Sequence, residues 1–276
     1  MIVFPNAKIN IGLNIVERRP DGYHNLESVF YPIKIYDRLQ VEEAANSHAA
    51  ECNIVSEGYT IAGDLKDNLV VKAYNLIRQE YKIPAVNVKL TKLIPMGAGL
   101  GGGSSDAAYM LKALNDLFEL NIPEEKLQQT AAKLGADCAI FIKNLPVYAT
   151  GIGNVFHYDV KIPSLTGKTL IVVKPDVFVS TKDAYSMIHP KSPKYPLTES
   201  ICKPIETWKN TIVNDFEVSV FAKFPLIWDV KKKLYSMGAE YASMSGSGSS
   251  VFGIFNNPIK NFETHFPDMF SVQIPL

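Results

Sequence analysis

The chain has 276 residues, of which 47% are hydrophobic and 20% charged, a composition typical of globular proteins with one large or two small domains. Its 28 basic residues equal its 28 acidic residues, which argues against nucleic acid or an anionic membrane as a partner held by bulk charge. No apolar run reaches the ~18–20 residues of a membrane span, and the three cysteines match no disulfide or zinc pattern, so we expect a cytoplasmic protein.

The first predicted element is a strand, because apolar residues at positions 9, 11, 13 and 15 alternate with polar or small ones. Lys8 and Asn10 therefore project from the same face of this strand. Pro20-Asp21-Gly22 has the composition of a turn. The spacing then predicts three strands and one helix, which are Val29–Ile35, Leu39–Glu43, Val86–Leu90 and the helix Asn68–Tyr81.

A glycine-rich segment follows, with five glycines among the seven residues Gly97–Gly103. Apolar residues directly after it recur at helical spacing, and Ser104 or Ser105 is expected to cap that helix. Asp106 suits the positive end of the first turn. A strand, a glycine loop and a helix N-terminus in this order are typical of a phosphate site, because glycines allow close approach and free N–H groups attract anions.

Other phosphate motifs match less well. Gly97, Gly99 and Gly102 satisfy G-x-G-x-x-G, but the acidic residue of a dinucleotide site would fall inside a predicted helix. A dinucleotide oxidoreductase therefore stays only as an alternative. No Gly-Lys-Ser/Thr directly follows the glycine-rich segment, and the chain contains no His-Arg-Asp, so a Walker-type or protein-kinase site is excluded there.

The second half of the chain interleaves strands and helices irregularly, which favours the α+β class. A helix is expected from Pro123 to Gly135, and the turn-forming segment Lys161–Gly167 is the expected joint between domains 1–160 and 161–276. Beyond the joint, the pattern predicts strands Thr169–Val173 and Val251–Phe255, a helix Leu226–Met237, and a small-residue loop Met244–Ser250.

Three blocks, in order along nearly the whole chain, resemble the GHMP small-molecule kinases. Pro5–Asn14 is similar to the family's N-terminal strand motif, Pro95–Ala108 to its phosphate loop, and Met244–Ser250 to its C-terminal glycine motif. The resemblance implies an N-terminal ribosomal-protein-S5-like domain that binds ATP and a ferredoxin-like C-terminal domain on the substrate side, with the active site between them.

Two further blocks, Asp21–His24 and Gly135–Phe141, and the pair Gly102-Gly103 before the serines, resemble one branch of the family. That branch uses ATP and Mg²⁺ to phosphorylate a hydroxyl of a cytidine diphosphate-linked polyol in the non-mevalonate synthesis of isoprenoid precursors. A mevalonate- or homoserine-type kinase, or a non-catalytic nucleotide-binding sensor on the same fold, stays as an alternative. We expect a monomer or a weak homodimer, and the sequence does not identify the magnesium ligand.

The resemblance assigns roles to individual positions. Asp137 would accept the hydroxyl proton, and Lys8 would pair with it. The ATP-binding residues would be Asn68, Pro95, Met96, Gly97, Ala98, Gly99, Leu100, Gly101, Gly102, Gly103, Ser104 and Ser105. The substrate-binding residues would be Asn10, Tyr23, His24, Tyr185, Gly246, Ser247 and Gly248.

Several of these residues have a plainer interpretation from their pattern alone. Asp137 and Asn68 would be helix N-caps, and Lys8 a solvated strand residue. Tyr23 and His24 would fill the surface after a turn, and Tyr185 would be a buried helix tyrosine.

Overall fold

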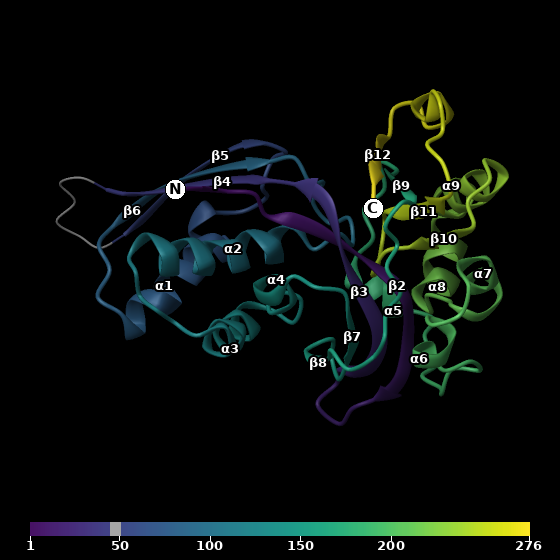
Figure 1. Ribbon diagram of the computed structural model, residues 1–276, viewed down its shortest axis with the longest axis horizontal. Helices are drawn as coiled ribbons and strands as arrows, with labels where there is room; N and C mark the ends of the chain where they lie inside the picture. Colours follow the sequence, from purple (N-terminus) through teal and green to yellow (C-terminus); the bar gives the residue numbers. More distant parts are fainter. Residues whose placement is uncertain (45–50) are drawn as a thin grey trace. The chain divides into compact units, whose positions relative to one another are not determined.

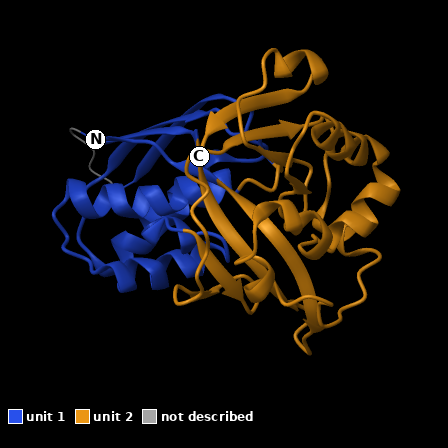
Figure 2. Ribbon diagram, turned by 45° about the vertical axis from the view of Figure 1, so that its right-hand side comes forward, with its two compact units in different colours: residues 1–7, 35–96, 101–145 blue, residues 8–34, 97–100, 146–276 orange. Residues whose placement is uncertain are grey.

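The computed structural model describes residues 1–44 and 51–276, and these residues form two compact units (Figure 2). Unit 1 consists of residues 1–7, 35–96 and 101–145, and unit 2 of residues 8–34, 97–100 and 146–276. Both units are discontinuous in sequence, so the chain passes between them within two strands and within the glycine-rich segment. The predicted division between residues 160 and 161 stays a prediction.

Unit 1 is a sheet with helices against one face (Figure 1). The strand order is β1-β4-β6-β5, with β4 antiparallel and β5 parallel to β6. Because parallel neighbours need a crossover connection, the chain runs from β5 through helix α1 before it returns as β6. The strands are β1 (Ile2–Val3), β4 (Arg38–Glu43), β5 (Cys52–Gly58) and β6 (Val86–Lys92), and the α-helices are α1 (Leu69–Glu80), α2 (Gly102–Leu117), α3 (Glu124–Leu134) and α4 (Ile140–Lys143).

Unit 2 contains most of one sheet, of order β2-β3-β7-β8, and all of a second, of order β10-β11-β9-β12. The first has strands β2 (Asn6–Arg18), β3 (His24–Tyr36), β7 (Val147–Thr150) and β8 (Val155–His157). The second has strands β9 (Thr169–Lys174), β10 (Tyr241–Met244), β11 (Val251–Phe255) and β12 (Phe270–Pro275). The α-helices of unit 2 are α5 (Thr181–Tyr185), α6 (Leu197–Ser200), α7 (Trp208–Thr211), α8 (Phe216–Lys223) and α9 (Pro225–Ser236).

One hydrophobic cluster of unit 2 joins both of its sheets to α5, α8 and α9. Leu13 and Ile15 of β2 pack there with Ile171 and Val173 of β9 and with residues of α8 such as Phe216. The alternation predicted for the first strand is thus the alternation of a strand that places one row of side chains in this core. The same alternation keeps Lys8 and Asn10 together on the opposite row.

The predicted elements agree with the structure where the hydrophobic pattern was strong. The helix expected at Asn68–Tyr81 is α1, and the one expected at Pro123–Gly135 is α3, with both predicted end residues in the cap positions. Sequence reasoning missed the strands β1, β5, β7, β8, β10 and β12, the helix α4 of unit 1, and the helices α6, α7 and α8 of unit 2. Taken over residues 1–44 and 51–276, no helix is both long and apolar enough to cross a bilayer.

Candidate functional site

The carbonyl oxygen of Gly99 is a meeting point of three sequence blocks within unit 2. Lys8 Nζ donates to it at 3.1 Å, and Ser245 Oγ donates to it at 2.8 Å. Lys8 Nζ also donates to Asn10 Oδ1 at 2.5 Å, and the backbone N–H of Asn10 donates to Ser245 Oγ at 3.2 Å. The N-terminal strand, the glycine-rich segment and the C-terminal small-residue loop therefore share one hydrogen-bond network.

Lys8 is buried, with 3% of its surface exposed, so the interpretation as a solvated strand lysine is wrong. Its ammonium lies 5.3 Å from the centre of the Phe30 ring, a distance at which the ring face attracts a cation. Asn10 is 1% exposed and also donates from Nδ2 to Ser28 Oγ at 2.8 Å. The predicted face of the strand thus presents a buried cation and a buried amide whose oxygen and nitrogen both form hydrogen bonds.

Gly99 must be glycine at this position. Its φ is +72°, and a Cβ atom would lie 1.9 Å from the carbonyl oxygen of Ser245. The loop Met244–Ser250 is held in turn by Asn214, whose Nδ2 donates to the carbonyls of Met244 and Gly246, each at 2.8 Å. Sequence reasoning missed Asn214, because a single asparagine between unremarkable neighbours carries no motif.

The N-terminus of α2 differs from the prediction. The helix begins at Gly102, and its N-cap is Gly101 with φ +72° and no side-chain cap, so neither Ser104 nor Ser105 is the cap. Glycine was needed in the left-handed region at that point, and the helix therefore starts before the serines. The first N–H groups of α2 consequently have no capping side chain, as an anion site requires.

Two predicted substrate residues stack on each other in unit 2. The rings of His24 and Tyr185 lie 4.7 Å apart at an interplanar angle of 28°, and Tyr185 meets Phe216 edge-on at 4.8 Å. Burial, and secondarily Arg18, lowers the pKa of His24, while burial raises the pKa of Tyr185. Tyr23 is 61% exposed, and its backbone N–H donates to the Asp21 carboxylate at 3.1 Å.

Asp137 lies in unit 1, in the turn between α3 and α4, and is half-buried. It is not an N-cap, since α4 begins at Ile140 with Ala139 as its cap. The next residue, Cys138, is hydrogen-bonded to the Ser104 side chain of α2, and burial raises the pKa of its thiol to about 11. The turn that carries Asp137 therefore lies against the start of α2.

Asn68 is the N-cap of α1, where its side chain accepts from the Val70 N–H at 2.8 Å. This confirms the plainer interpretation of that residue, and its role in ATP binding stays a prediction.

A buried charge cluster in unit 1 was not predicted. Lys92 Nζ donates to the carboxylates of Asp37 and Asp106, and none of the three residues is more than 2% exposed. Burial raises the pKa of Asp106 to about 7, the Lys92 ammonium opposes that rise, and the neighbouring Asp37 carboxylate adds to it. Oδ1 of Asp106 has no hydrogen-bond partner. A lysine at a strand end carries no sequence signal for such a cluster.

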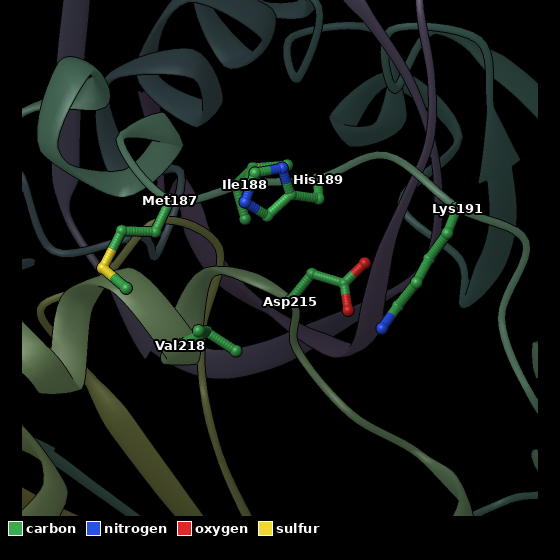
Figure 3. A pocket seen from close by; sticks show the side chains of 6 residues that line it. All are labelled: Met187, Ile188, His189, Lys191, Asp215 and Val218. Atoms are coloured by element: carbon green, nitrogen blue, oxygen red, sulfur yellow. The ribbon is translucent and has the colours of Figure 1, made fainter.

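Unit 2 also has a cavity of about 130 Å³ that involves none of the predicted site residues. Figure 3 shows the six side chains that line it, which are Met187, Ile188, His189, Lys191, Asp215 and Val218. Asp215 Oδ2 accepts from the Ile15 N–H of β2 at 2.7 Å, and burial raises the pKa of this carboxyl. Asp215 thus supports the strand that carries Lys8.

Within each unit, the structure brings some predicted residues together. In unit 2 these are Lys8, Asn10 and Gly99 with the loop that contains Gly246, and separately His24 with Tyr185. In unit 1 they are Ser104 and the turn of Asp137. Ser245 belongs to a block that the sequence had singled out, but only the fold shows that its hydroxyl bridges two other blocks.

Comparison with known proteins identifies relatives along the full chain. The family model for the GHMP kinases N terminal domain matches residues 68–144, and that for the GHMP kinases C terminal domain matches residues 202–265. A protein of Bacteroides fragilis (strain YCH46) named 4-diphosphocytidyl-2-C-methyl-D-erythritol kinase is 55% identical over 276 residues, which is 100% of both chains. A protein of the same name from Cytophaga hutchinsonii is 43% identical over 276 residues, again 100% of both chains.

Solved structures of kinases with similar names also align with the chain. A crystal structure of 4-(cytidine 5'-diphospho)-2C-methyl-D-erythritol kinase aligns with a TM-score of 0.81 at 28% identity, and the match covers 100% of this chain and 99% of the other. A homoserine kinase from Cytophaga hutchinsonii aligns with a TM-score of 0.62 at 18% identity, covering 98% and 94% of the two chains, and thus shares the fold.

Proposed function

The chain belongs to the GHMP kinase family, and from this membership we propose that it transfers the γ-phosphoryl group of ATP to the 2-hydroxyl of 4-diphosphocytidyl-2-C-methyl-D-erythritol. Relatives that carry the name of this activity match the chain from end to end at 43–55% identity. The single structural observation that carries the proposal is the Gly99 network, in which three blocks of the kinase family converge on one carbonyl.

The triphosphate of ATP would bind the backbone N–H groups of Gly97–Ser105. Glycines at positive φ and an uncapped helix N-terminus present N–H groups and partial positive charge, which suits phosphate oxygens. Asn68 would contribute to the adenine site through the backbone around the N-terminus of α1, since its side chain already caps that helix.

Asp137 and Lys8 would act on the reacting groups. As the substrate hydroxyl oxygen bonds to the γ-phosphorus and the bond to the β-phosphate oxygen breaks, ADP leaves and the hydroxyl proton passes to the Asp137 carboxylate. The Lys8 ammonium, held by Asn10 and Gly99, would stabilise the negative charge that develops during transfer. Its buried position strengthens this effect, because charges interact more strongly away from water.

The cytosine of the substrate would be recognised by His24, Tyr23 and Tyr185. A neutral imidazole has one donor and one acceptor nitrogen, which suits the edge of a base, and aromatic faces stack on its ring. The low pKa of His24 supports the neutral form. The backbone of the loop Gly246–Gly248 would contact the diphosphate of the substrate.

Mg²⁺ accompanies ATP in phosphoryl transfer, where it neutralises charge on the phosphate oxygens. Among residues 1–44 and 51–276 there is no cluster of three or more acidic, histidine or cysteine side chains that could enclose a metal. Mg²⁺ usually binds through one or two protein oxygens, phosphates and waters. The half-buried Ser104 hydroxyl, in the first turn of α2, is the oxygen donor that would hold it.

The decisive experiment measures phosphorylation of the cytidyl substrate, mevalonate and homoserine in parallel with Mg-ATP. We expect turnover of the cytidyl substrate alone.

We also expect Asp137→Asn to lower kcat by about 10²–10⁴-fold with ATP affinity retained, since it removes only the proton acceptor. The exposed Asp116→Asn on α2 serves as the matched control. Turnover of mevalonate or homoserine, with none of the cytidyl compound, would reject the proposed substrate. Full activity of Asp137→Asn would reject Asp137 as the proton acceptor.

A non-catalytic nucleotide sensor on the same fold would bind ATP but show no turnover in the same assay. Saturable NAD binding would support the oxidoreductase alternative. We further propose that the enzyme works in the cytoplasm and that it is a monomer or a weak homodimer. Sedimentation of the purified chain with and without ATP would test the oligomeric state.

A further inference from the structure

The buried cluster of Lys92, Asp37 and Asp106 joins three elements of unit 1. Lys92 is the last residue of β6, Asp37 lies between β3 and β4, and Asp106 is the fifth residue of α2. The Lys92 ammonium donates to Asp37 and, at 2.8 Å, to Asp106. Such a cluster costs free energy, because buried charges lose their hydration, and apolar side chains could also join these elements. Its position therefore calls for an explanation.

On the entry side, the cluster fixes the backbone that leads into the glycine-rich segment. Asp37 Oδ1 accepts the N–H groups of Leu93 at 2.6 Å and of Ile94 at 2.8 Å. These residues link the end of β6 to Pro95, the first residue of the predicted ATP-binding segment. The Asp37 carboxylate thus continues the hydrogen bonding of β6 past the end of the sheet.

On the exit side, the cluster fixes the start of α2. Asp106 directly follows Ser105, and its Oδ2 is held by Lys92. A Cβ atom on Gly102 would lie 3.2 Å from Lys92 Nζ and 3.0 Å from the Ile94 side chain, so the ammonium passes directly beside the first residue of the helix. The side chain of Lys92 therefore connects the two ends of the glycine-rich segment.

The geometry points to Lys92, Asp37 and Asp106 as positioning residues for ATP, which hold the uncapped N-terminus of α2 and the strand before it in the phosphate-binding arrangement. The inference rests on the proposed function. A segment of five glycines is conformationally permissive, and α2 has no side-chain cap to fix its first turn. N–H groups bind an anion well only when they are already oriented, and within unit 1 this cluster supplies contacts on both sides of the segment.

The test uses Asp106→Ala and its conservative counterpart Asp106→Asn, which keeps an oxygen for Lys92. We expect Asp106→Ala to raise the KM for ATP about 10- to 100-fold, with the KM for the cytidyl substrate nearly unchanged, because displaced N–H groups misplace the triphosphate. Asp106→Asn should restore most of the ATP affinity. The control is Lys168→Met, which breaks the partly buried Lys168–Glu240 pair of unit 2 and should lower thermal stability without changing the KM for ATP.

Binding of an ATP analogue, measured by calorimetry without the cytidyl substrate, separates this inference from the proposed function. If the unmodified chain does not bind the analogue, the proposed function fails. If it binds and folded Asp106→Ala binds equally well, or if both KM values rise together, the positioning role is rejected.

Hydrogen exchange on the unmodified chain gives an answer even if the variants do not fold. We expect the amides of Leu93 and Ile94 to be protected without ATP, as part of a preformed site. Exchange as fast as that of an exposed loop would overturn the inference.

Discussion

His24 is a single side chain whose environment determines what it can recognise. It stacks on Tyr185, and burial, followed by Arg18, holds its pKa below the ordinary value of 6.5. The neutral ring keeps one nitrogen as a hydrogen-bond acceptor at neutral pH. A protonated ring has two donors and no acceptor, so it would present a different edge to a base.

We therefore predict that affinity for the cytidyl substrate falls with acidification. Because the pKa of His24 lies below 6.5, the KM for this substrate should stay flat above about pH 6.5 and rise as the pH falls below that value, while the KM for ATP changes less. His24→Gln, which cannot titrate, should have a higher but flat KM above and below that value. A flat profile for the unmodified chain would contradict the role of His24 in recognition.

The same pKa shift also affects stability, with a defined sign. As the pH falls through 6.5, the unfolded chain binds a proton at His24 that the folded chain resists. The free energy of unfolding therefore decreases from that pH downward, until the pH passes the lower pKa of the folded state. The full contribution of the neutral His24 ring to the free energy of unfolding is present above pH 6.5.

At the scale of elements, the glycine-rich segment contains glycines of two kinds. Gly99 has positive φ and no room for a side chain, so the fold itself requires glycine there. Gly103 lies inside α2, and a Cβ atom there would meet nothing within 4 Å. The fold does not require glycine at this position, and close approach of a ligand would explain it.

We predict opposite effects of two alanine substitutions on stability. Gly103→Ala should raise the free energy of unfolding by about 0.5–1 kcal/mol, since alanine is the better helix former, yet weaken ATP binding. Gly99→Ala should lower both stability and ATP affinity, because its Cβ meets the Ser245 carbonyl. Denaturant titration and calorimetry measure the two quantities. Unchanged ATP affinity in Gly103→Ala would argue against phosphate binding at the start of α2.

At the scale of the whole molecule, the two units share strands. The chain crosses between them at 7/8, 34/35, 96/97, 100/101 and 145/146, and the first two crossings lie within β2 and β3. Neither unit can therefore be cut out as a continuous piece of sequence. We expect the chain to unfold as one cooperative system.

This expectation can be tested because both tryptophans belong to unit 2. Trp208 is 1% exposed and Trp228 is 41% exposed, so tryptophan fluorescence reports on unit 2, whereas far-ultraviolet circular dichroism reports on the helices of both units. The two unfolding curves should coincide in urea, as for a two-state transition. A circular dichroism transition at lower urea than the fluorescence transition would show that unit 1 unfolds separately.

The zero net charge of the whole molecule is consistent with the binding of polyanionic ligands. The chain holds 28 basic and 28 acidic residues, yet the proposed site attracts phosphate through backbone N–H groups and a buried lysine. Positive potential concentrated at a loop does not appear in the total charge.

The amino-acid sequence by itself determined the family, the α+β class, and the strand and helices with clear hydrophobic periodicity. These follow from local patterns, since side-chain alternation and glycine spacing are properties of neighbouring residues. Only the tertiary structure decided that Lys8 is buried, that Gly101 rather than a serine is the N-cap of α2, and that Lys92 joins Asp37 to Asp106. These features depend on groups distant in sequence, because burial and ion pairing arise only when separate elements pack together.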